Sequence, residues 1–318
     1  MILERYELIN DALTKELKFK DNKLFYNNLK LNLLDNTLPN FTDNKFDKIT
    51  SSISEFYDEI QFPNYDYFDD YATLFEKGNS NNFTRRIDSE LDYGINVLEL
   101  GCGTGQLSLF LARGNRTIYG VDISNGSLLL GDNFRKQNDI NNAYFMKMDI
   151  FDLKFKENYF DFTVSNGVLH HTKDARKAFK SLVKVTKPGG LILVGLYHRY
   201  GRLLTKIKQK LASILKDNIF LLDKYASGLN TKKKKDAWVN DQFFNPHETL
   251  HLPQETLNWF KEDGVEFINL LPHCDDTNKT IFSKRDLPKL PKLDEFLMAF
   301  NKSQIQEGGF FIIIGKKL

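Results

Sequence analysis

The sequence has 318 residues, of which 41% are hydrophobic and 27% are charged, and its formal net charge is +2. A chain of this length and apolar content is long enough for one catalytic domain with additions. The near-neutral charge argues against a strong attraction to nucleic acid or to an acidic membrane surface, so we expect neither partner.

Cysteine usage and the N-terminus bear on the cell compartment. The two cysteines are Cys102 and Cys274, and Cys102 lies within a glycine-rich stretch, so a structural disulfide is not expected. The N-terminus is too charged for a secretory signal, and no apolar run approaches the roughly 18 residues of a membrane-spanning helix. We therefore expect a cytoplasmic protein without a membrane span.

Residues 1–50 begin with a helical pattern. Apolar residues recur at steps of three or four, at Ile2, Tyr6, Ile9, Leu13 and Leu17, which is the spacing of an amphipathic helix. A polar stretch rich in Asn and Asp follows. We therefore expect residues 1–50 to form a helical extension, followed by an aromatic-rich segment over residues 51–75.

The most informative stretch is Val97–Gln106, which reads VLELGCGTGQ. Its apolar start predicts a buried strand, and the alternating glycines predict a tight turn that a ligand can approach closely. The run 106–113, which contains Leu and Ala, predicts a helix whose free N–H groups favour an anionic group at the turn.

The spacing of the glycines indicates the kind of ligand. A dinucleotide fingerprint, G-x-G-x-x-G, would need its third glycine where Gln106 stands. In addition, the carboxylate of Glu99 just before the turn would repel a pyrophosphate. The pattern suits a ligand that carries an ammonium and a sulfonium group.

Further elements follow in order along the chain. Asp122 ends a second predicted strand, Asp149 follows a third, and Asn166 follows a fourth. A Lys-Pro-Gly-Gly turn precedes the fifth. The four strands after the first are expected at 117–122, 143–148, 159–165 and 191–196. Beyond them, a basic amphipathic helix is expected at 202–215, another helix at 253–263, and two more strands at 265–271 and 310–315.

Together these features resemble the class I S-adenosylmethionine-dependent methyltransferases of the small-molecule type, a group that includes the quinone-biosynthesis C-methyltransferases. The motif E-x-G-x-G-x-G and the Pro-Gly-Gly turn carry the resemblance. It implies a Rossmann-like, doubly wound α/β sheet of seven strands, mostly parallel, with an antiparallel last strand. It also implies a methyltransferase domain over residues 51–318, with an inserted substrate lid at about 198–252 and a second addition at about 273–309.

The resemblance implies S-adenosylmethionine as cofactor, with S-adenosylhomocysteine as product. It assigns Asp122 to the ribose hydroxyls, and Asp149 with its neighbour to the adenine. Two aromatic residues before the first strand are candidates for a cation–π contact with the sulfonium, although plain packing of a cap helix is the commoner role. The expected cofactor-binding residues are Glu99, Gly101, Cys102, Gly103, Thr104, Gly105, Gln106, Asp122, Ile123, Asp149, Ile150, Asn166, Gly167, Val168, His170, Tyr57 and Tyr71.

The insertion at 198–252 is expected to build the pocket for a small-molecule acceptor, as insertions at this place usually do in the family. Methyl transfer is an in-line displacement that needs the acceptor held collinear and water excluded. A hydroxyl or amine acceptor also needs a base, whereas a thioether does not. Candidates for the base or for orientation are His171, Tyr197 and His247. Candidates for acceptor binding are His198, Tyr200, Trp238, Gln242 and His251.

Two motifs in the insertion have simpler explanations than the functions that they suggest. The segment 247–251 matches the zinc-protease pattern H-E-x-x-H, but Pro253 would limit a helix there to little more than one turn, and no third ligand stands out. We therefore expect no metal. The run Lys232–Lys235 is most simply a solvated face, with a phosphate or carboxylate on the acceptor as the alternative.

Three classes of function stay open, and a methyltransferase of a small metabolite leads. A methyltransferase of RNA or protein is the first alternative, but an RNA enzyme would be expected to show a broad basic face. A non-catalytic cofactor-binding subunit is the second, against which the intact glycine turn and both acids argue. The N-terminal segment also offers a surface for a homodimer.

Overall fold

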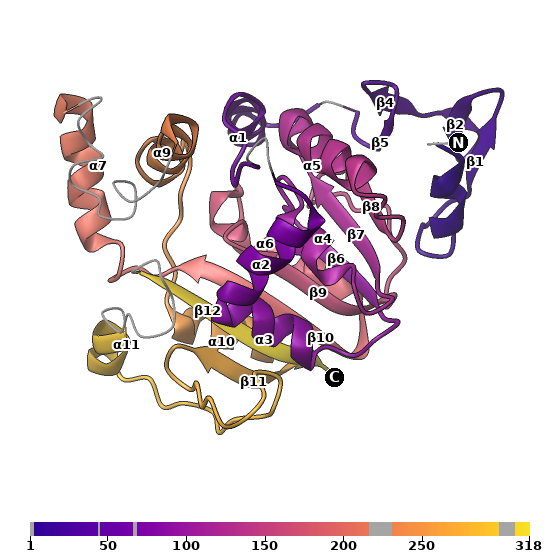
Figure 1. Ribbon diagram of the computed structural model, residues 1–318. Coiled ribbons are helices and arrows are strands. Elements are labelled where there is room, and N and C mark those ends of the chain that lie inside the picture. Colours follow the sequence, from indigo (N-terminus) through magenta and orange to yellow (C-terminus); the bar gives the residue numbers. More distant parts are fainter. Residues whose placement is uncertain (1–2, 44, 66–68, 216–230, 299–308) are drawn as a thin grey trace.

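The computed structural model describes residues 3–43, 45–65, 69–215, 231–298 and 309–318. A sheet of nine strands forms its centre, in the order β11-β12-β10-β9-β6-β7-β8-β5-β4 (Figure 1). The core strands are β6 (Asn96–Leu100), β7 (Thr117–Asp122), β8 (Ala143–Lys147), β9 (Phe160–Asn166), β10 (Thr186–Tyr197), β11 (Val265–Leu271) and β12 (Phe310–Lys317).

Most of this sheet is parallel. Strands β6, β7, β8, β9 and β10 pair in parallel, and β12 lies antiparallel between β10 and β11. Parallel strands covered on both faces have near-continuous apolar sequences, and all five residues of β8 are buried. The predicted Rossmann-like fold with an antiparallel last strand is confirmed.

Helices connect and cover the strands. The elements between or after core strands are α4 (Gln106–Leu111), α5 (Asn125–Gln137), η2 (Leu169–His171), α6 (Ala175–Val185) and α10 (Pro253–Glu262). As the sequence predicts, α10 has a proline in its first turn, and Gly264 takes a φ of +67° just beyond its end. Helices α6 and α10 pack together through the stacked rings of Phe179 and Phe260.

Three helices precede β6 and lie over the carboxyl ends of the core strands or beside α4. They are α1 (Lys48–Glu59), α2 (Tyr71–Ser80) and α3 (Asn82–Glu90). Helix α1 begins after Asp47, whose side chain accepts hydrogen bonds from the backbone N–H groups of Ile49 and Thr50. Helix α1 packs on α5, whereas α2 and α3 pack on α4.

The prediction of a helical extension over residues 1–50 is wrong for most of that segment. Among the described residues before α1, only η1 (Glu4–Ile9) is helical, and five short strands follow it: β1 (Leu17–Lys20), β2 (Lys23–Tyr26), β3 (Leu29–Lys30), β4 (Asn32–Leu34) and β5 (Leu38–Asn40). Three Asx-Asn pairs with positive φ lie in the turns: the first two form two-residue hairpin loops, which such residues favour, and the third lies in a three-residue loop. The three pairs are Asp21-Asn22, Asn27-Asn28 and Asp35-Asn36.

This segment gives the sheet nine strands where seven were predicted, because β5 and β4 continue it beyond β8. The segment also supplies donors to carbonyls of β8. The Tyr6 hydroxyl donates to the Phe145 carbonyl at 2.9 Å, and the Arg5 guanidinium donates to the Ala143 carbonyl at 2.6 Å. The strands β1 and β2 stand at the outer end of this edge in Figure 1.

The predicted insertion follows β10. Its described elements are α7 (Leu203–Leu215), α9 (Lys232–Val239) and η4, a π-helical turn over Asn240–Phe244. The helix predicted at 202–215 is confirmed, and residues 216–230 of the insertion lie outside the described ranges. The addition between β11 and β12 contains α11 (Lys292–Met298).

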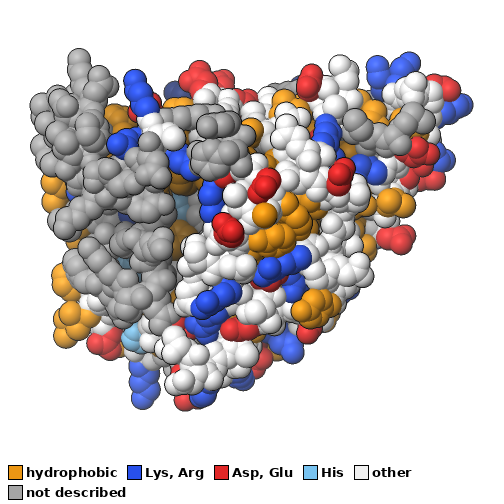
Figure 2. Space-filling model, viewed as in Figure 1, with side chains coloured by type: hydrophobic (Ala, Val, Ile, Leu, Met, Phe, Trp, Pro, Cys, Tyr) orange, Lys and Arg blue, Asp and Glu red, His pale blue; other side chains and the backbone are white. Residues whose placement is uncertain are grey.

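On the face drawn in Figure 2, lysine and arginine side chains lie among acidic ones. In the described part of the chain, no helix combines the length and the apolar character that crossing a membrane requires.

The hydrogen bond of Tyr6 gives a prediction about stability. Tyr6→Phe should lower the free energy of unfolding by about 1–2 kcal/mol, because the buried Phe145 carbonyl loses its donor. Urea denaturation measures this change. Tyr93→Phe is the matched control, since Tyr93 is 81% exposed and should leave stability unchanged. Equal stability of the wild type and Tyr6→Phe would contradict the anchoring role.

Candidate cofactor and acceptor site

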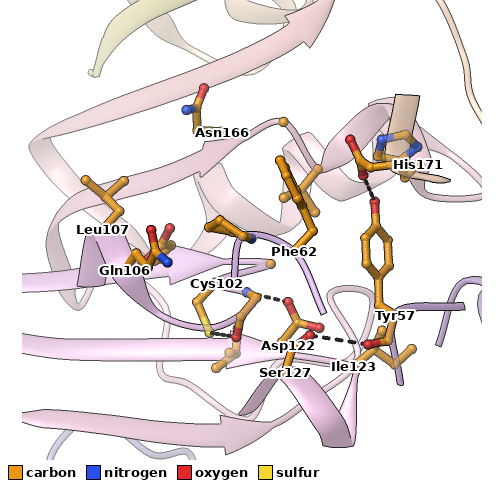
Figure 3. Close-up of a pocket in the computed structure, with 18 of the residues that line it drawn as sticks. Tyr57, Phe62, Cys102, Gln106, Leu107, Asp122, Ile123, Ser127, Asn166 and His171 are labelled. Atoms are coloured by element: carbon orange, nitrogen blue, oxygen red, sulfur yellow. Dashed lines mark hydrogen bonds between the residues drawn. The ribbon is translucent and has the colours of Figure 1, made fainter. Parts of the chain in front are cut away.

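A cavity of about 720 Å³ lies at the carboxyl ends of β6, β7, β8 and β9. Ligands of open α/β sheets bind at this edge. In Figure 3, Gln106 and Leu107 lie at one end of the cavity and Tyr57 and His171 at the other, with Cys102 and Asp122 between them. The volume falls in the range of small-molecule and cofactor sites.

The glycine turn after β6 forms part of the floor. Gly101 has a φ of +71°, and a Cβ added to it would lie 2.3 Å from a Val168 methyl carbon. The N–H groups of Gly101 and Cys102 both donate to the Val121 carbonyl. Gly105, also left-handed, is the N-cap of α4. A side chain at Gly101 would therefore strain the backbone and collide with the loop after β9.

Asp122 joins this turn to the loop after β7. Its Oδ2 accepts from the Gly103 N–H and its Oδ1 from the Ser124 N–H, both at 2.8 Å. Burial raises the pKa of Asp122, while these backbone bonds act in the opposite direction. A carboxylate has about four lone-pair sites, so Asp122 retains capacity to accept hydrogen bonds from a ligand in the cavity.

Glu99 is the most buried acid of the floor. The Ser108 hydroxyl of α4 donates to its carboxylate, and the residue lines the cavity. Burial raises the pKa of Glu99 to about 7. A cationic group of a ligand beside it would favour its ionised form.

Most of the expected cofactor-binding residues come together in this cavity. The residues from the predicted set that line it are Glu99, Gly101, Cys102, Gly103, Gln106, Asp122, Ile123, Asp149, Ile150, Asn166, Gly167, Val168 and Tyr57. Sequence reasoning did not find Phe62 and Ser127, which also line it. Neither has a motif of its own, and only the packing of α1 and α5 brings them here.

Four expected cofactor residues do not line the cavity. Thr104 is fully buried and its hydroxyl donates to the Pro63 carbonyl at 2.7 Å. Gly105 serves the turn into α4, and the Tyr71 ring packs on Phe75. His170 is fully buried with its ring 4.0 Å from that of Tyr197, and neither ring nitrogen has a partner among the described residues.

Helix α1 roofs the cavity and is tied to the floor. Asp58 Oδ1 accepts hydrogen bonds from the Ser124 hydroxyl and the Gly126 N–H, and its Oδ2 accepts from the Asn125 side chain. The roof is therefore fixed at the N-terminus of α5, beside Asp122. No sequence motif marks Asp58, because its partners lie about seventy residues further along the chain.

His171 lines the cavity in a defined protonation state. Its Nδ1 lies 2.8 Å from the His247 carbonyl, which can only accept, so Nδ1 carries the proton. Burial lowers the pKa of His171 from its ordinary 6.5, which keeps the imidazole neutral at pH 7. Its Nε2 thus presents a lone pair on the side of the ring opposite this bond, with no hydrogen-bond partner among the described residues.

Among the remaining candidates for the acceptor site, Tyr197 of β10 lines the cavity, whereas those of the insertion do not. The Tyr197 hydroxyl accepts from Gln242 at 2.8 Å. His247 contributes its carbonyl to His171, and the Trp238 ring lies 6.0 Å from that of Phe62. His198, Tyr200, Gln242 and His251 do not line the cavity either.

The H-E-x-x-H segment is extended rather than helical. The Thr249 N–H donates to the His170 carbonyl, and the His251 N–H donates to the Tyr197 carbonyl. Glu248 forms an ion pair with Arg202 at 2.6 Å. Its two histidines therefore lack the shared helical face of a zinc site. No cluster of metal-ligating side chains is found among the residues that the structure describes.

Comparison with known proteins gives a consistent picture. A family model for a methyltransferase domain matches residues 91–262. The ubiquinone/menaquinone biosynthesis C-methyltransferase of Vibrio cholerae is 34% identical over 105 residues, which is 32% of this chain and 40% of that protein. The chain thus matches less than half the length of this curated relative.

Two solved structures share the fold. Geranyl diphosphate C-methyltransferase from Streptomyces coelicolor A3(2) superposes with a TM-score of 0.51 and 12% identity, covering 86% of this chain and 100% of that one. PKMT2 from Rickettsia typhi, solved in complex with AdoHcy, gives a TM-score of 0.51 and 18% identity over 70% of this chain and 49% of that one. At these identities the likeness concerns the fold alone.

The raised pKa of Glu99 gives a prediction about the ligand-free protein. Its folded pKa of about 7 exceeds its ordinary 4.5, so the unfolded chain ionises first as pH rises. The wild-type free energy of unfolding should therefore fall between pH 4.5 and 7 and stay lowered above. Glutamine cannot ionise, so Glu99→Gln should not show this fall. Relative to the wild type, its free energy of unfolding should rise by up to about 3 kcal/mol as the pH goes from 4.5 to 8. Urea denaturation of both proteins at pH 4.5 and pH 8 measures this change. If their free energies of unfolding vary with pH in parallel, the assignment of the pH dependence to Glu99 is wrong.

Proposed function

This chain belongs to the class I S-adenosylmethionine-dependent methyltransferase family, and we propose that it transfers a methyl group from S-adenosylmethionine to a small-molecule acceptor. The observation that carries the proposal is the cavity itself. One cavity brings together the glycine turn, Glu99, Asp122, Asp149 and a neutral His171. These groups come from separate strand ends, and together they match the functional groups of the cofactor.

The donor and acceptor chemistry of the cavity fits S-adenosylmethionine. Asp122 has free lone pairs for ribose hydroxyls, and Asp149 with Ile150 offers an acceptor and an apolar surface for adenine. The carboxylate of Glu99 suits the ammonium of the methionine part. Gly101 packs against Val168 with no room for a side chain, so it lines the cavity with backbone alone. When bound, the cofactor supplies a methyl group on a sulfonium leaving group.

The residues at the other end of the cavity suit the acceptor. Tyr57 and Tyr197 place aromatic rings there, and His171 adds a neutral imidazole whose Nε2 can accept a proton. The roof helix α1 shields this end from water, which favours displacement by the acceptor over hydrolysis. We assign His171 the role of general base and Tyr197 an orienting role, whereas His247 acts through its carbonyl by holding the His171 tautomer.

A small acceptor is favoured over RNA or protein. The cavity lies beneath the α1 roof, and charges of both signs are mixed on the face drawn in Figure 2. A macromolecule that binds through its phosphates would need a basic surface. The cytoplasmic location and the homodimer remain predictions from the sequence.

Asp122 provides the test of the cofactor. Asp122→Ala should weaken S-adenosylmethionine and S-adenosylhomocysteine binding at least about tenfold, because the ribose loses charge-assisted hydrogen bonds. Calorimetric titration measures both affinities, and thermal unfolding checks that the variant is folded. Asp152→Ala is the matched control, since its side chain is 68% exposed. Failure of the folded wild type to bind either compound would refute the proposal.

His171 provides the test of the base. His171→Gln should lower kcat about a hundredfold or more while leaving S-adenosylmethionine affinity nearly unchanged. Because its pKa lies below 6.5, wild-type kcat should be level at pH 7 and fall only at lower pH, as the imidazole becomes protonated. Transfer of labelled methyl at several pH values measures this, with the exposed His273→Gln as control. An unchanged kcat in His171→Gln would mean that the acceptor needs no base.

A further inference from the structure

A further carboxylate lines the acceptor end of the cavity, and the proposed function does not use it. Asp241 lies in η4, within the insertion rather than in the methyltransferase core. It is 5% exposed and lines the same cavity as His171 and Tyr57. Its charge also acts on His171, whose pKa it raises against the larger opposing effect of burial. Both side chains lie against Tyr57, whose hydroxyl donates to Asp241 at 2.7 Å and whose ring centre lies 6.4 Å from that of His171.

The hydrogen bonds of Asp241 come from neutral donors. The Tyr57 hydroxyl donates to its Oδ1 at 2.7 Å, a bond drawn as a dashed line in Figure 3, and the Gln242 side chain donates to its Oδ2 at 3.0 Å. The Asn245 side chain in turn donates to the Tyr57 hydroxyl, which leaves that hydroxyl's proton for Asp241. Each carboxylate oxygen therefore keeps a lone pair for a further donor.

No cation in the described ranges forms an ion pair with Asp241. The buried Arg202 pairs instead with Glu248 at 2.6 Å and stacks 3.8 Å from the centre of the Tyr197 ring. It is linked to Asp241 through the Gln242 amide, and the two charges attract each other without direct contact. A buried carboxylate without a cation is costly. Such a group in a cavity wall is suited to a ligand that places a cation in direct contact with it.

The neighbouring walls favour the same kind of ligand. The rings of Tyr57, Tyr197 and Phe310 line this end of the cavity, and aromatic rings attract organic cations as well as apolar groups. His171 is neutral and adds an acceptor rather than a competing positive charge. An N–H-bearing cation can thus donate to both Asp241 and Nε2 of His171, whereas a thioether can donate to neither.

We propose that the acceptor is an amine, which enters the site as an ammonium ion bound by the carboxylate of Asp241 and delivers one proton to Nε2 of His171. This inference rests on the proposed function and names its class of substrate. Asp241 is then the residue that selects an amine over an alcohol of the same shape.

The reaction balances with these groups alone. The ammonium loses one proton to His171, which becomes an imidazolium beside the Asp241 carboxylate. The freed nitrogen lone pair forms the N–C bond to the methyl carbon as the C–S bond breaks, and its electron pair goes to sulfur, which becomes a neutral thioether. The methylated amine leaves as a cation, and His171 returns its proton to solvent.

A matched pair of probes tests the proposal. With S-adenosylhomocysteine saturating the protein, calorimetry compares 2-phenylethylamine with 2-phenylethanol, which differ only in the amine and the hydroxyl. The amine should bind at least tenfold more tightly than the alcohol. Asp241→Asn should reduce this preference at least tenfold while alcohol binding stays nearly unchanged. Asp236→Asn, an exposed aspartate on α9, is the matched control and should keep the preference.

Each result decides the matter. Equal or tighter binding of the alcohol, binding of neither probe to the saturated protein, or an amine preference that survives Asp241→Asn would overturn the amine assignment. The titration with S-adenosylhomocysteine alone separates this failure from a failure of the proposed function, which would show as no cofactor binding by the folded wild type. Thermal unfolding and cofactor affinity of Asp241→Asn show whether that variant retains its fold.

Discussion

The carboxylate of Asp122 holds together the loops on which the whole site depends. One oxygen accepts from the turn after β6 and the other from the loop after β7. Ser124, the residue bound by the second oxygen, also caps α5 and donates its hydroxyl to Asp58 of the roof helix. Floor and roof are thereby connected through two aspartates and one serine, so the cavity is preorganised before a ligand arrives.

The acceptor end depends on a second connection, between segments far apart in the chain. Tyr57 from the roof and Asp241 from the insertion are 184 positions apart, and a 2.7 Å hydrogen bond joins them. Behind Asp241, the bonds through Gln242 to Arg202 and the ion pair with Glu248 form a buried polar network. Buried networks of this kind fix side-chain orientation when every member is satisfied. The roof helix and the insertion thus meet at the Tyr57 hydroxyl, which donates to Asp241 and accepts from Asn245.

The sequence predicts best what depends on short-range pattern. The strand and glycine turn of Val97–Gln106, the acid at Asp122 and the helix from Pro253 follow from local periodicity and turn chemistry, and each lies where expected. The N-terminal strands are not predicted, because the apolar residues of that segment recur at helical spacing. The hairpins there depend instead on Asx-Asn pairs, whose positive φ angles form the turns. The roles of Asp58 and Asp241 could not be predicted, since their partners are set by tertiary packing alone.

The N-terminal segment has a consequence for association between molecules. Parallel sheets of this kind end in a strand whose outward carbonyls invite another strand to pair. Here the outward carbonyls of Ala143, Phe145 and Lys147 already accept from the Arg5 side chain, the Tyr6 hydroxyl and the Phe41 N–H. A second copy finds no free backbone acceptors at these three positions, so a partner cannot extend the sheet by pairing with them.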